Sequence, residues 1–536
     1  MRGPTPIPIL ATMNRNDGDS TGNEQVGRPP TTFAHGVASG DPTAHGVVIW
    51  TRISGITDPL VAVRWMVATD ESLTNIVVQG VAASSAAVDW TVHVDVPGLT
   101  AGTTYFYGFV VGDEHSVVGR TRTLPRTDAD QLRFAFVSCA KFNAGFFNVY
   151  ARIAERDDID FVLHLGDYIY EASNTPPKSQ TPGADIGRPF DPVGECRTVD
   201  DYRRRYAQYR LDPDVQAMHA AHPMIASLDN HELADGAWRG GSDNHDDDRD
   251  GPWEQRRAAA FRVRWEWLPA RMPDPRDSER VYRSIRIGNL AELFLMDYRS
   301  RRDKTVAGAE MYDRTRTALG PEQKAWLIDG ITTCDAQWRL IGNPSPFTQT
   351  WQPGLSEELV RPMRALKFMH ATEDAVDEDQ WDGYPAERDE LLDAIEAAGV
   401  GRSIVLAGDL HVSLATELTH PNDPWPVESR APFVVEVATP SITSQNLDEK
   451  LHLTPRTAAL EMEQEFVAAI PGLRWCELES HGYVVADVRA DAIVLQWWFV
   501  DTVVERSDGE RLGQQMVVPF GEARVHAMDV ARVTSS

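Results

Sequence analysis

Cysteine is scarce in this sequence, because only Cys139, Cys196, Cys334 and Cys476 occur among its 536 residues. These four lie far apart and no two of them form a CxxC pair. The spacing excludes a zinc ribbon and a dense disulfide scaffold. A single cysteine can still serve as a ligand to a metal ion.

Long hydrophobic runs are also missing. No apolar stretch approaches the roughly 20 residues that a transmembrane helix requires, so we expect no membrane span. The start of the chain has only a short apolar patch interrupted by prolines, which is too weak for a secretory or a twin-arginine signal. We therefore expect a protein that stays inside the cell, or one whose export signal has been removed or left out.

Basic residues are in deficit, with 52 lysines and arginines against 80 acidic residues and a formal net charge of -28. Such a charge repels nucleic acids and anionic membrane surfaces. Nucleic acid is therefore expected only as a possible substrate. The 42% hydrophobic and 25% charged residues are ordinary for a soluble globular protein. The composition leaves the oligomeric state open.

The N-terminal 126 residues fall into two regions of different composition and hydrophobic pattern. Residues 1–30 are rich in Pro, Gly, Asn, Asp and Thr and predict a disordered N-terminal arm. Residues 31–126 contain short alternating runs separated by turns, such as "VAVRWMVA" and "WTVHVDV", which predict a β-sandwich. The stretch "GLTAGTTYFYGFVV", with Tyr105 and Tyr107, resembles a strand of immunoglobulin-like and fibronectin type III modules.

From 131 to 520, apolar strands alternate with helical patterns, which predicts an α/β domain followed by a C-terminal tail at 521–536. We expect helices in "FFNVYARIAERDD", "EQKAWLIDGITT" and "ERDELLDAIEAA". The expected strands are 132–138, 160–165, 223–228, 339–343, 403–408 and 433–438, with a hairpin at 482–501. The sequence beyond about Ser507 shows no clear pattern.

Four of these strands end in residues typical of metal sites or of acid and base catalysis. They are followed by Ser138 and Cys139, by "GDYIY" with Asp167 and Tyr170, by "DNHE" with Asp229, Asn230, His231 and Glu232, and by "GDLH" with Asp409 and His411. Open α/β sheets place their sites at the carboxyl ends of strands. We therefore expect the four groups to converge in space.

Each group alone has an ordinary explanation. Gly-Asp after a strand is commonly a turn, an isolated buried cysteine is usually a small apolar residue, and His411 alone is compatible with a core histidine. The combination favours a site, because chance turns do not repeatedly supply oxygen, nitrogen and sulfur donors at the same end of successive strands.

The blocks GD, NHE and GDxH resemble the calcineurin-like metallophosphoesterases, whose usual pattern is DxH, GD, GNHE, H and GHxH. The sequence departs from that pattern with "VSCAKF" in place of DxH, Asp229 in place of Gly, and "GDLH" in place of GHxH. These variants, the tyrosine of GDxxY and the segment "FAHGVASGDPTAHGVVIWTRI" are similar to the PhoD-like alkaline phosphatase and phosphodiesterase family. Further matches are "YRSIRIGNLAELFLMDYRSRR", "LGPEQKAWL" and "VATPSITS", so the resemblance runs from about residue 33 to at least 500.

The resemblance implies an α+β fold, in which an N-terminal immunoglobulin/fibronectin III-like β-sandwich precedes a calcineurin-like α/β metallophosphoesterase domain. The latter has two β-sheets flanked by helices. It implies the hydrolysis of small-molecule phosphate esters by an activated oxygen nucleophile, with in-line displacement at phosphorus. It also implies a ferric ion, Fe(3+), and calcium, Ca(2+). Carried over residue by residue, the iron ligands are Cys139, Tyr170 and His411, the bridging ligand is Asp167, and the calcium ligands are Asn230 and Asp409.

The residue types independently favour iron and calcium. Asp, Asn and Tyr oxygens suit hard cations, and a thiolate and a phenolate are strong donors for Fe(3+). A zinc pair is more naturally built from several histidines; Zn, Mn or Mg at one or both positions remain the alternatives. His231 matches the catalytic histidine of the family and is expected to protonate the leaving group, with Asp229 or Glu232 orienting it.

Two further features have an ordinary interpretation that we prefer. "SDNHDDDRDG" contains a DxDxDG pattern, but Arg257 stands where an EF-hand loop requires Glu, so we expect a solvated acidic loop. "YRRRYAQYR" offers Arg203, Arg204, Arg205 and Arg210 as phosphate ligands, yet a helix face is the simpler interpretation. An arginine near the metals is nevertheless expected to bind the substrate phosphate.

The site pattern does not determine the leaving group. The alternatives to a phosphatase are a phospholipase D-like or nucleotide-directed phosphodiesterase of the same family. A less favoured alternative is a non-catalytic, metal-containing binding protein, which should have lost ligands, whereas all six ligand types are present here.

Overall fold

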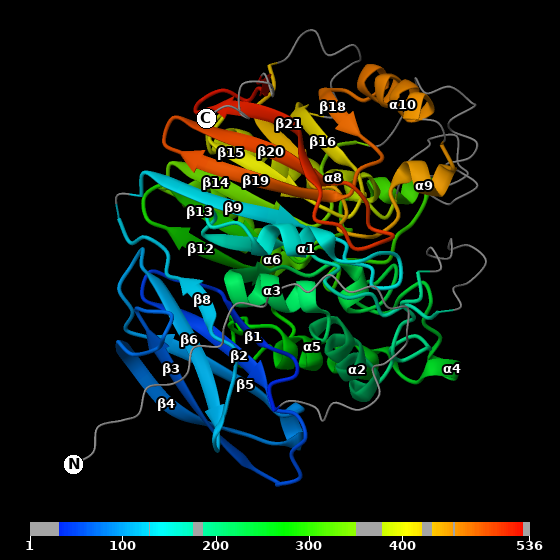
Figure 1. Ribbon diagram of the computed structural model, residues 1–536. Coiled ribbons are helices and arrows are strands. Elements are labelled where there is room, and N and C mark those ends of the chain that lie inside the picture. The colour runs from blue at the N-terminus through cyan, green and yellow to red at the C-terminus, as the bar shows by residue number, and fades with distance from the viewer. Residues whose placement is uncertain are drawn as a thin grey trace.

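The computed structural model describes residues 32–127, 129–174, 186–349, 378–420, 431–453 and 456–528. The expected α+β class is confirmed, because the described strands form three sheets and helices cover two of them (Figure 1). The segments 1–31, 128, 175–185, 350–377, 421–430, 454–455 and 529–536 lie outside the described residues, and with them the whole of the expected N-terminal arm and the second half of the expected C-terminal tail.

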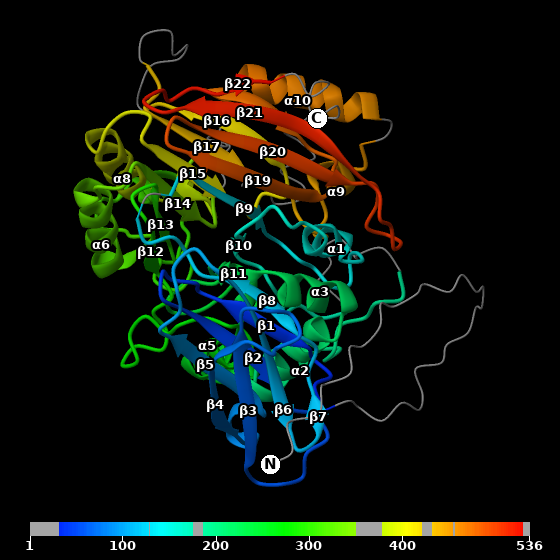
Figure 2. The same ribbon diagram turned by 60° about the vertical axis from the view of Figure 1, so that its left-hand side comes forward.

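The largest sheet has ten strands and runs through the whole molecule (Figure 2). Its central strands β9, β10 and β11 are parallel, and β19 joins β9 on the other side in antiparallel fashion. In spatial order the strands are β22 (His526–Ala527), β21 (Glu510–Pro519), β20 (Ala492–Val500), β19 (Gly482–Arg489), β9 (Gln131–Val137), β10 (Phe161–His164), β11 (Pro223–Ala226), β1 (Val37–Gly40), β2 (Gly46–Arg52) and β5 (Thr91–Pro97).

A second sheet of seven strands packs against this one. Its strands β13, β14, β15 and β17 are parallel neighbours, and the remaining strands pair antiparallel. In spatial order they are β12 (Arg283–Ile287), β13 (Ala291–Leu295), β14 (Trp338–Asn343), β15 (Ser403–Ala407), β17 (Val434–Ala438), β16 (Ser413–Leu418) and β18 (Leu473–Glu477).

The main core lies between these two sheets, and the sequence of β9 shows why. Its side chains alternate between the two faces of the sheet. Leu132, Phe134 and Phe136 enter the core shared with the seven-stranded sheet. Ala135 and Val137 enter the core shared with the helices on the opposite face. The strand is therefore buried on both sides, which explains its nearly continuous run of apolar residues.

Helices cover the outer face of each sheet (Figures 1 and 2). Residues of α1, α2, α3 and α5 share a core with the ten-stranded sheet, and residues of α6 and α8 share one with the seven-stranded sheet. The helices are α1 (Asn148–Ala154), α2 (Val199–Arg210), α3 (Pro213–Ala221), α4 (Asp247–Asp250), α5 (Trp253–Trp267), α6 (Gly320–Thr333), α8 (Pro385–Ala397), α9 (Leu447–Leu451) and α10 (Arg456–Ala469). Short 3-10 helices are η1 (Ala86–Val88), η2 (Asn230–Glu232), η3 (Gly308–Tyr312) and η4 (Trp381–Gly383).

The N-terminal strands are divided between two sheets. Five of them form the third sheet: β4 (Ile76–Ser84), β3 (Val61–Ala68), β6 (Thr104–Val111), β7 (Glu114–His115) and β8 (Gly119–Arg122). The other three, β1, β2 and β5, extend the ten-stranded sheet, and β1 pairs in parallel with β11. Apolar residues from both groups pack together in one core. The N-terminal segment is thus continuous with the rest of the molecule through hydrogen-bonded strands.

The expected elements correspond closely to those observed. All six expected strands appear, as β9, β10, β11, β14, β15 and β17, and the expected hairpin is β19 and β20. The three expected helices are α1, α6 and α8. The sequence analysis missed β21, whose polar residues such as Gln514 and Gln515 conceal a ten-residue strand that pairs with β20.

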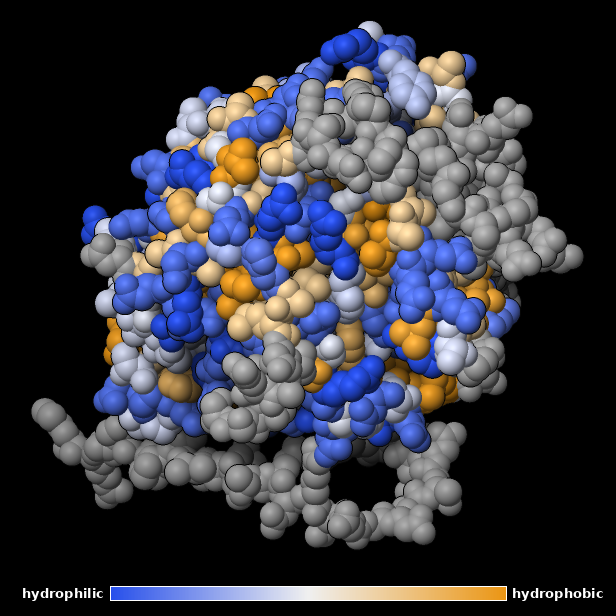
Figure 3. Space-filling view, turned by 90° about the horizontal axis from the view of Figure 1, so that it is seen from above, coloured by the Kyte–Doolittle hydropathy of each residue, from blue (hydrophilic) through white to orange (hydrophobic). Residues whose placement is uncertain are grey.

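Hydrophobic residues do not form one large patch on the face seen in Figure 3, where they are scattered among hydrophilic ones. Within the described part of the chain, no helix combines the length and the apolar character that crossing a membrane requires.

Candidate metal centre

The carboxyl ends of four strands meet at one place, as the sequence pattern predicts. Cys139 follows β9, Asp167 follows β10, Asp229 follows β11 and Asp409 follows β15. The first three strands are neighbours in the ten-stranded sheet, and β15 belongs to the facing sheet. Backbone bonds join the loops: Cys139 N–H donates to the carbonyl of Gly166 at 3.2 Å. Residues 270 positions apart in the chain therefore share one site.

Three different donor atoms come together at its centre. One donor atom from each of Cys139, Asp167 and His411 lies within 4.8 Å of the other two. Cys139 and Asp167 are about 1% exposed, and His411 is partly buried. Sulfur, carboxylate oxygen and imidazole nitrogen at such spacing match a transition-metal ligand set.

Tyr170 completes this group. Its hydroxyl donates to Oδ2 of Asp167 at 2.9 Å and lies 3.4 Å from Nε2 of His411. The Ser444 hydroxyl donates to the Tyr170 oxygen at 2.7 Å. The backbone N–H of Tyr170 and that of Phe142 both donate to the hydroxyl of Tyr209 on α2, at 3.1 and 3.0 Å. Tyr209 thereby connects the loops that carry Tyr170 and Cys139.

A hydrogen bond of Nδ1 fixes the orientation of the His411 ring. Nδ1 lies 2.8 Å from the carbonyl oxygen of Gln445, which accepts a hydrogen bond and therefore places the ring proton on Nδ1. Nε2 is then the unprotonated nitrogen, and it faces Tyr170. Metal-binding histidines commonly have this arrangement, in which a carbonyl fixes the tautomer.

Backbone strain is concentrated in these loops. Nine described residues other than glycine have positive φ, and four of them are Cys139 (63°), Asp167 (56°), Asp409 (65°) and His411 (58°). Such conformations cost on the order of 1–3 kcal/mol each and cluster at functional sites, where the surrounding structure enforces them.

Gly166 allows two of the loops to come close together. Its φ is +119°, and a Cβ at this position would lie 2.5 Å from Cβ of Asp229 and 2.7 Å from its backbone nitrogen. Only glycine fits both the angle and the space. The glycine of the "GD" motif thus allows the loop after β10 to pack on the loop after β11.

Asp229 and Asp409 are held by one buried arginine. Arg299 has a fully buried side chain; its Nε donates to Asp229, and its Nη2 donates to Asp409 at 2.8 Å. Its third nitrogen, Nη1, donates to Asp379 at 2.6 Å. Gln380 also donates to Asp409, at 2.6 Å. An arginine is thus present at the site, but all three of its guanidinium nitrogens bind carboxylates, and the expected arginine ligand of the substrate phosphate stays a prediction.

His231 is fixed on one side by a carboxylate. Its Nδ1 lies 2.7 Å from Oε2 of the buried Glu171, and its backbone N–H donates to Oδ1 of Asp167 at 3.1 Å. Nε2 lies 4.0 Å from Asp235. Although burial lowers it, the Glu171 and Asp167 carboxylates together raise the pKa of His231 to about 10. Glu171, rather than Asp229 or Glu232, is therefore the residue that orients His231.

Glu232 has a structural function instead. Its carboxylate accepts hydrogen bonds from the backbone N–H groups of Asp167 (3.0 Å), Tyr168 (2.6 Å) and Asp229 (2.9 Å). It thus holds the Asp167 loop against η2. Beside it, the Asn230 amide nitrogen donates to Asp235 at 3.3 Å, while the Asn230 amide oxygen has no hydrogen-bond partner among the described residues.

The donor set fits a cation. Burial and then the Asp167 carboxylate raise the pKa of the Cys139 thiol well above its usual range, and the same two causes act on Tyr170. Burial also raises the pKa of Asp167 and, strongly, that of Asp229. So many buried acidic groups are costly without positive charge among them. A bound metal ion would supply it, and the thiol and phenol would bind as anions.

Three residues of this arrangement were assigned no function from the sequence, although two of them lie within the quoted motifs and the third directly follows one. Glu171 directly follows "GDYIY", Arg299 lies in "YRSIRIGNLAELFLMDYRSRR", and Ser444 ends "VATPSITS". Their proximity to the motifs was the one indication in the sequence that these residues belong to the site. Their contacts with the site are seen only in the structure.

The ordinary interpretation of the arginine-rich helix agrees with the structure. Arg203 pairs with Glu266, and Arg204 pairs with Asp191. Arg205 is fully buried and donates to backbone carbonyls, including those of Tyr170 and Ala172. Arg210 is also buried, 4.3 Å from the ring of Trp50. These arginines stabilise the fold around the site.

The acidic loop forms the short helix α4. Asp246 caps it by accepting from the N–H of Asp248 at 3.0 Å, and Asp250 pairs with Arg249 and Arg197. Its carboxylates are thus used in capping and ion pairs.

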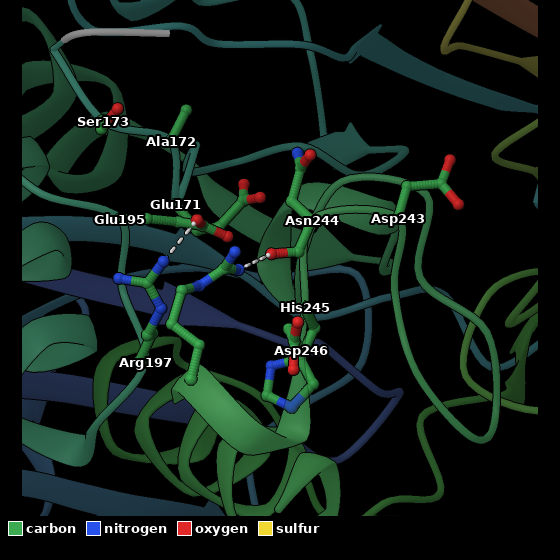
Figure 4. Close-up of a pocket in the computed structure, with 10 residues that line it drawn as sticks. Glu171, Ala172, Ser173, Glu195, Arg197, Asp243, Asn244, His245 and Asp246 are labelled. Carbon is green, nitrogen blue, oxygen red and sulfur yellow. Dashed lines mark hydrogen bonds and ion pairs between the residues drawn. The ribbon is translucent and has the colours of Figure 1, made fainter. Parts of the chain in front are cut away.

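A cavity of about 490 Å³ adjoins the site, because Glu171 forms part of its wall (Figure 4). Arg197 in this wall pairs with Glu195, and Arg249 donates to the carbonyl of Asn244. The remaining lining residues are Ala172, Ser173, Asp243, His245 and Asp246. A lining of this kind favours a hydrophilic ligand over an apolar one.

Comparisons with known proteins agree over most of the chain. The family model "PhoD-like phosphatase" matches residues 134–497, and the model "PhoD-like phosphatase, N-terminal domain" matches residues 19–125. A solved structure of PhoD superposes with a TM-score of 0.80 at 28% identity and covers 95% of each chain.

A curated relative, alkaline phosphatase D of Bacillus subtilis (strain 168), is 34% identical over 408 residues. The match spans 72% of this chain and 65% of that relative, slightly less than two thirds of its length.

Proposed function

Because the chain belongs to the PhoD-like phosphatase family, we propose that it is a metal-dependent hydrolase of phosphate esters. The observation that carries the proposal is the convergence of Cys139, Asp167 and His411, with Tyr170 bonded to Asp167, at the ends of strands from two sheets. Family members of this kind are metal-dependent, and the donor set described above suits metal ions.

We further propose which metal ions the site binds. Cys139, Tyr170 and His411 would hold Fe(3+), because thiolate, phenolate and imidazole are strong donors for it. Asn230 and Asp409 would hold Ca(2+), which prefers oxygen ligands. Asp167 would bridge the two ions. When bound, such metals act as Lewis acids that stabilise charge on a phosphoryl group.

The residues around the proposed metal ligands determine which groups hold and donate protons. Glu171 accepts from Nδ1 of His231, and because the pKa of His231 is raised to about 10, the imidazole is doubly protonated near neutral pH and Nε2 also carries a proton that it can donate to a leaving group. Asp229 does not contact the imidazole; it binds Arg299, so we propose that it positions Arg299 and Asp409 rather than His231. Ser444 donates to the Tyr170 oxygen and would stabilise its phenolate form.

The first experiment compares initial rates of the metal-loaded protein on a nitrophenyl phosphate monoester and on the bis-nitrophenyl diester, from pH 6 to 10, with iron and calcium measured by elemental analysis. We expect turnover that a chelator abolishes and that added metals restore. A diester preference would favour the nucleotide-directed or phospholipase D-like alternatives. A protein that binds the metals and hydrolyses neither compound would contradict the proposal and favour a binding function.

Glu171→Gln is expected to lower kcat about 10- to 100-fold with little change in KM or metal content. The reason is that mutating a residue that hydrogen-bonds to a catalytic histidine or a metal ligand, and thereby orients it, typically lowers activity by such a factor. The matched control is Glu195→Gln, a carboxylate of the same cavity that pairs with Arg197 and Arg256 instead of His231. Equal losses in the two variants would show that Glu171 acts only through the shape of the cavity.

A further inference from the structure

One short segment of the chain contacts all three proposed iron ligands. It follows β17 and comprises residues 441–446, of which the first four end the stretch "VATPSITS". Ser441 forms a parallel bridge with Ser138, directly after β9. Since β17 belongs to the seven-stranded sheet and β9 to the ten-stranded one, residues 441–446 are a crossing segment between the two sheets, beside the candidate metal centre.

The crossing segment binds the loop that carries Cys139. The carbonyl oxygen of Cys139 accepts hydrogen bonds from the N–H groups of Thr443 and Ser444, each at 3.3 Å. The Oγ of Ser444 lies 3.1 Å from the same carbonyl oxygen, and the N–H of Ile442 donates to the carbonyl of Ser138 at 3.0 Å. These bonds help to enforce the positive φ of Cys139, a conformation that persists only where the surrounding structure demands it.

The other two iron ligands are contacted by consecutive residues of the crossing segment. The Oγ of Ser444 lies 2.7 Å from the Tyr170 oxygen. The carbonyl of Gln445 accepts from Nδ1 of His411 at 2.8 Å. A shift of the crossing segment would therefore displace both side chains together with the Cys139 loop.

A buried hydrogen-bond network centred on Ser441 holds the crossing segment in place. The Oγ of Ser441 contacts the carbonyl of Ser444 and lies 2.9 Å from Oδ1 of Asn446 and 2.9 Å from Nδ1 of His481. The amide nitrogen of Asn446 donates to the carbonyl of Glu479, which turns its oxygen toward Ser441. Ser441 and Asn446 are fully buried, and His481 is 8% exposed.

The proton positions in this network follow from its donors and acceptors. A hydroxyl has a single proton, and two of the three groups around the Ser441 hydroxyl are oxygens that can only accept. Nδ1 of His481 is therefore the donor to Ser441, and the Ser441 hydroxyl donates to the crossing segment. His481 directly precedes β19, so the network fastens the crossing segment to the ten-stranded sheet.

The proposed calcium ligands have a separate support. Asp409 accepts from Arg299 at 2.8 Å and from Gln380 at 2.6 Å, and Asn230 donates to Asp235 at 3.3 Å. None of these partners belongs to the crossing segment. The two halves of the site are thus held by different parts of the chain.

We propose that Ser441 and His481 are positioning residues, which act through the crossing segment and place the three iron ligands before the ion binds. They do not act on the calcium ligands. Metal sites depend on surrounding residues that orient the ligands, and loss of one such residue typically costs about 10- to 100-fold in metal affinity. The inference rests on the proposed function, in which thiolate, phenolate and imidazole bind Fe(3+).

The test compares Ser441→Ala with the matched control Ser403→Ala. Ser403 is also buried, its hydroxyl has no hydrogen-bond partner among the described residues, and it begins β15, whereas the site lies at the other end of that strand. We measure the Kd of Fe(3+) by competition with a chelator, the Kd of Ca(2+) by calorimetry, and the visible absorption that thiolate and phenolate ligands give to Fe(3+). Ser441→Ala is expected to bind iron about 10- to 100-fold more weakly, with altered absorption and unchanged calcium affinity. The control should match the parent in all three.

His481 provides a second pair of variants. His481→Leu removes the donor to Ser441 and should weaken iron binding as Ser441→Ala does. His481→Asn keeps an N–H group near the position of Nδ1, so it should recover most of the iron affinity and the absorption of the parent.

Unchanged iron affinity in Ser441→Ala and His481→Leu would overturn the inference. Equal losses of iron and calcium affinity would also overturn it, because they would reveal a general effect on the fold. Failure of the proposed function has a different signature, since the unsubstituted protein would then hydrolyse neither nitrophenyl compound. The metal affinities are measured without substrate and would still decide whether the two residues position the iron ligands.

Discussion

Replacing Cys139 by alanine is expected to remove the bound iron and to lower kcat/KM by about 10³-fold or more. The thiol lies within 4.8 Å of donor atoms of Asp167 and His411 and is 1% exposed, so no solvent ligand replaces it easily. Loss of the metal would remove several kcal/mol of charge stabilisation in the transition state, and about 4 kcal/mol corresponds to a factor of 10³. Elemental analysis and initial rates on the purified variant give both numbers.

Cys476→Ala is the matched control for this prediction. Cys476 is also a buried free cysteine, but it lies on β18 in the apolar cluster beneath α10. The control should retain its iron and its activity, with a small loss of stability from the cavity that the substitution leaves. If Cys139→Ala also retains both, Cys139 is not a ligand and is simply a small residue of the core.

Replacing Arg299 by methionine is expected to lower the free energy of unfolding by about 3–5 kcal/mol. This is the typical cost of removing one partner from a buried ion pair, because the remaining charge stays buried without compensation. Two of the three carboxylates that Arg299 binds are well buried: the side chains of Asp229 and Asp409 are 2% and 15% exposed. Urea unfolding of the metal-loaded protein, followed by circular dichroism, measures the change.

Arg276→Met provides the comparison. Arg276 pairs with Asp274 at 2.9 Å, but its side chain is 89% exposed. Exposed pairs contribute about 0–1 kcal/mol, so this variant should unfold almost like the parent. A loss below about 1 kcal/mol for Arg299→Met would show that Asp229 and Asp409 become protonated or are neutralised by the metals without help from Arg299.

Much of the fold was predictable, because the central strands are buried on both faces and therefore have a clear apolar pattern. The strands that lead into the site end at Val137, His164 and Ala226, within two residues of the expected ends. By contrast, β21 was missed because residues 510–514 alternate between half-buried and exposed positions, and its pairing with β20 depends on a partner elsewhere in the chain.

The candidate site was predictable to the extent that it follows strands. Cys139, Asp167, Asp229 and Asp409 each stand directly after an apolar run, and parallel strands bring such positions together. The contacts of Glu171, Arg299 and Ser444 were not predictable, because these residues reach the site through side chains from loops. No spacing rule in the sequence connects Arg299 with Asp409 or Glu171 with His231.

The parallel pairing of β1 with β11 also has a consequence for the order in which the chain acquires its structure during synthesis. Ser39 pairs with Pro223, so β1 cannot form this pairing until a strand more than 180 residues later in the chain has been synthesised. Until then one edge of β1 exposes unpaired backbone groups, and long-range pairings of this kind form slowly. The newly synthesised β1 is therefore a segment that needs protection from aggregation until β11 has been made, and substitutions in β11 that weaken the pairing should increase aggregation of the nascent protein before any activity is lost.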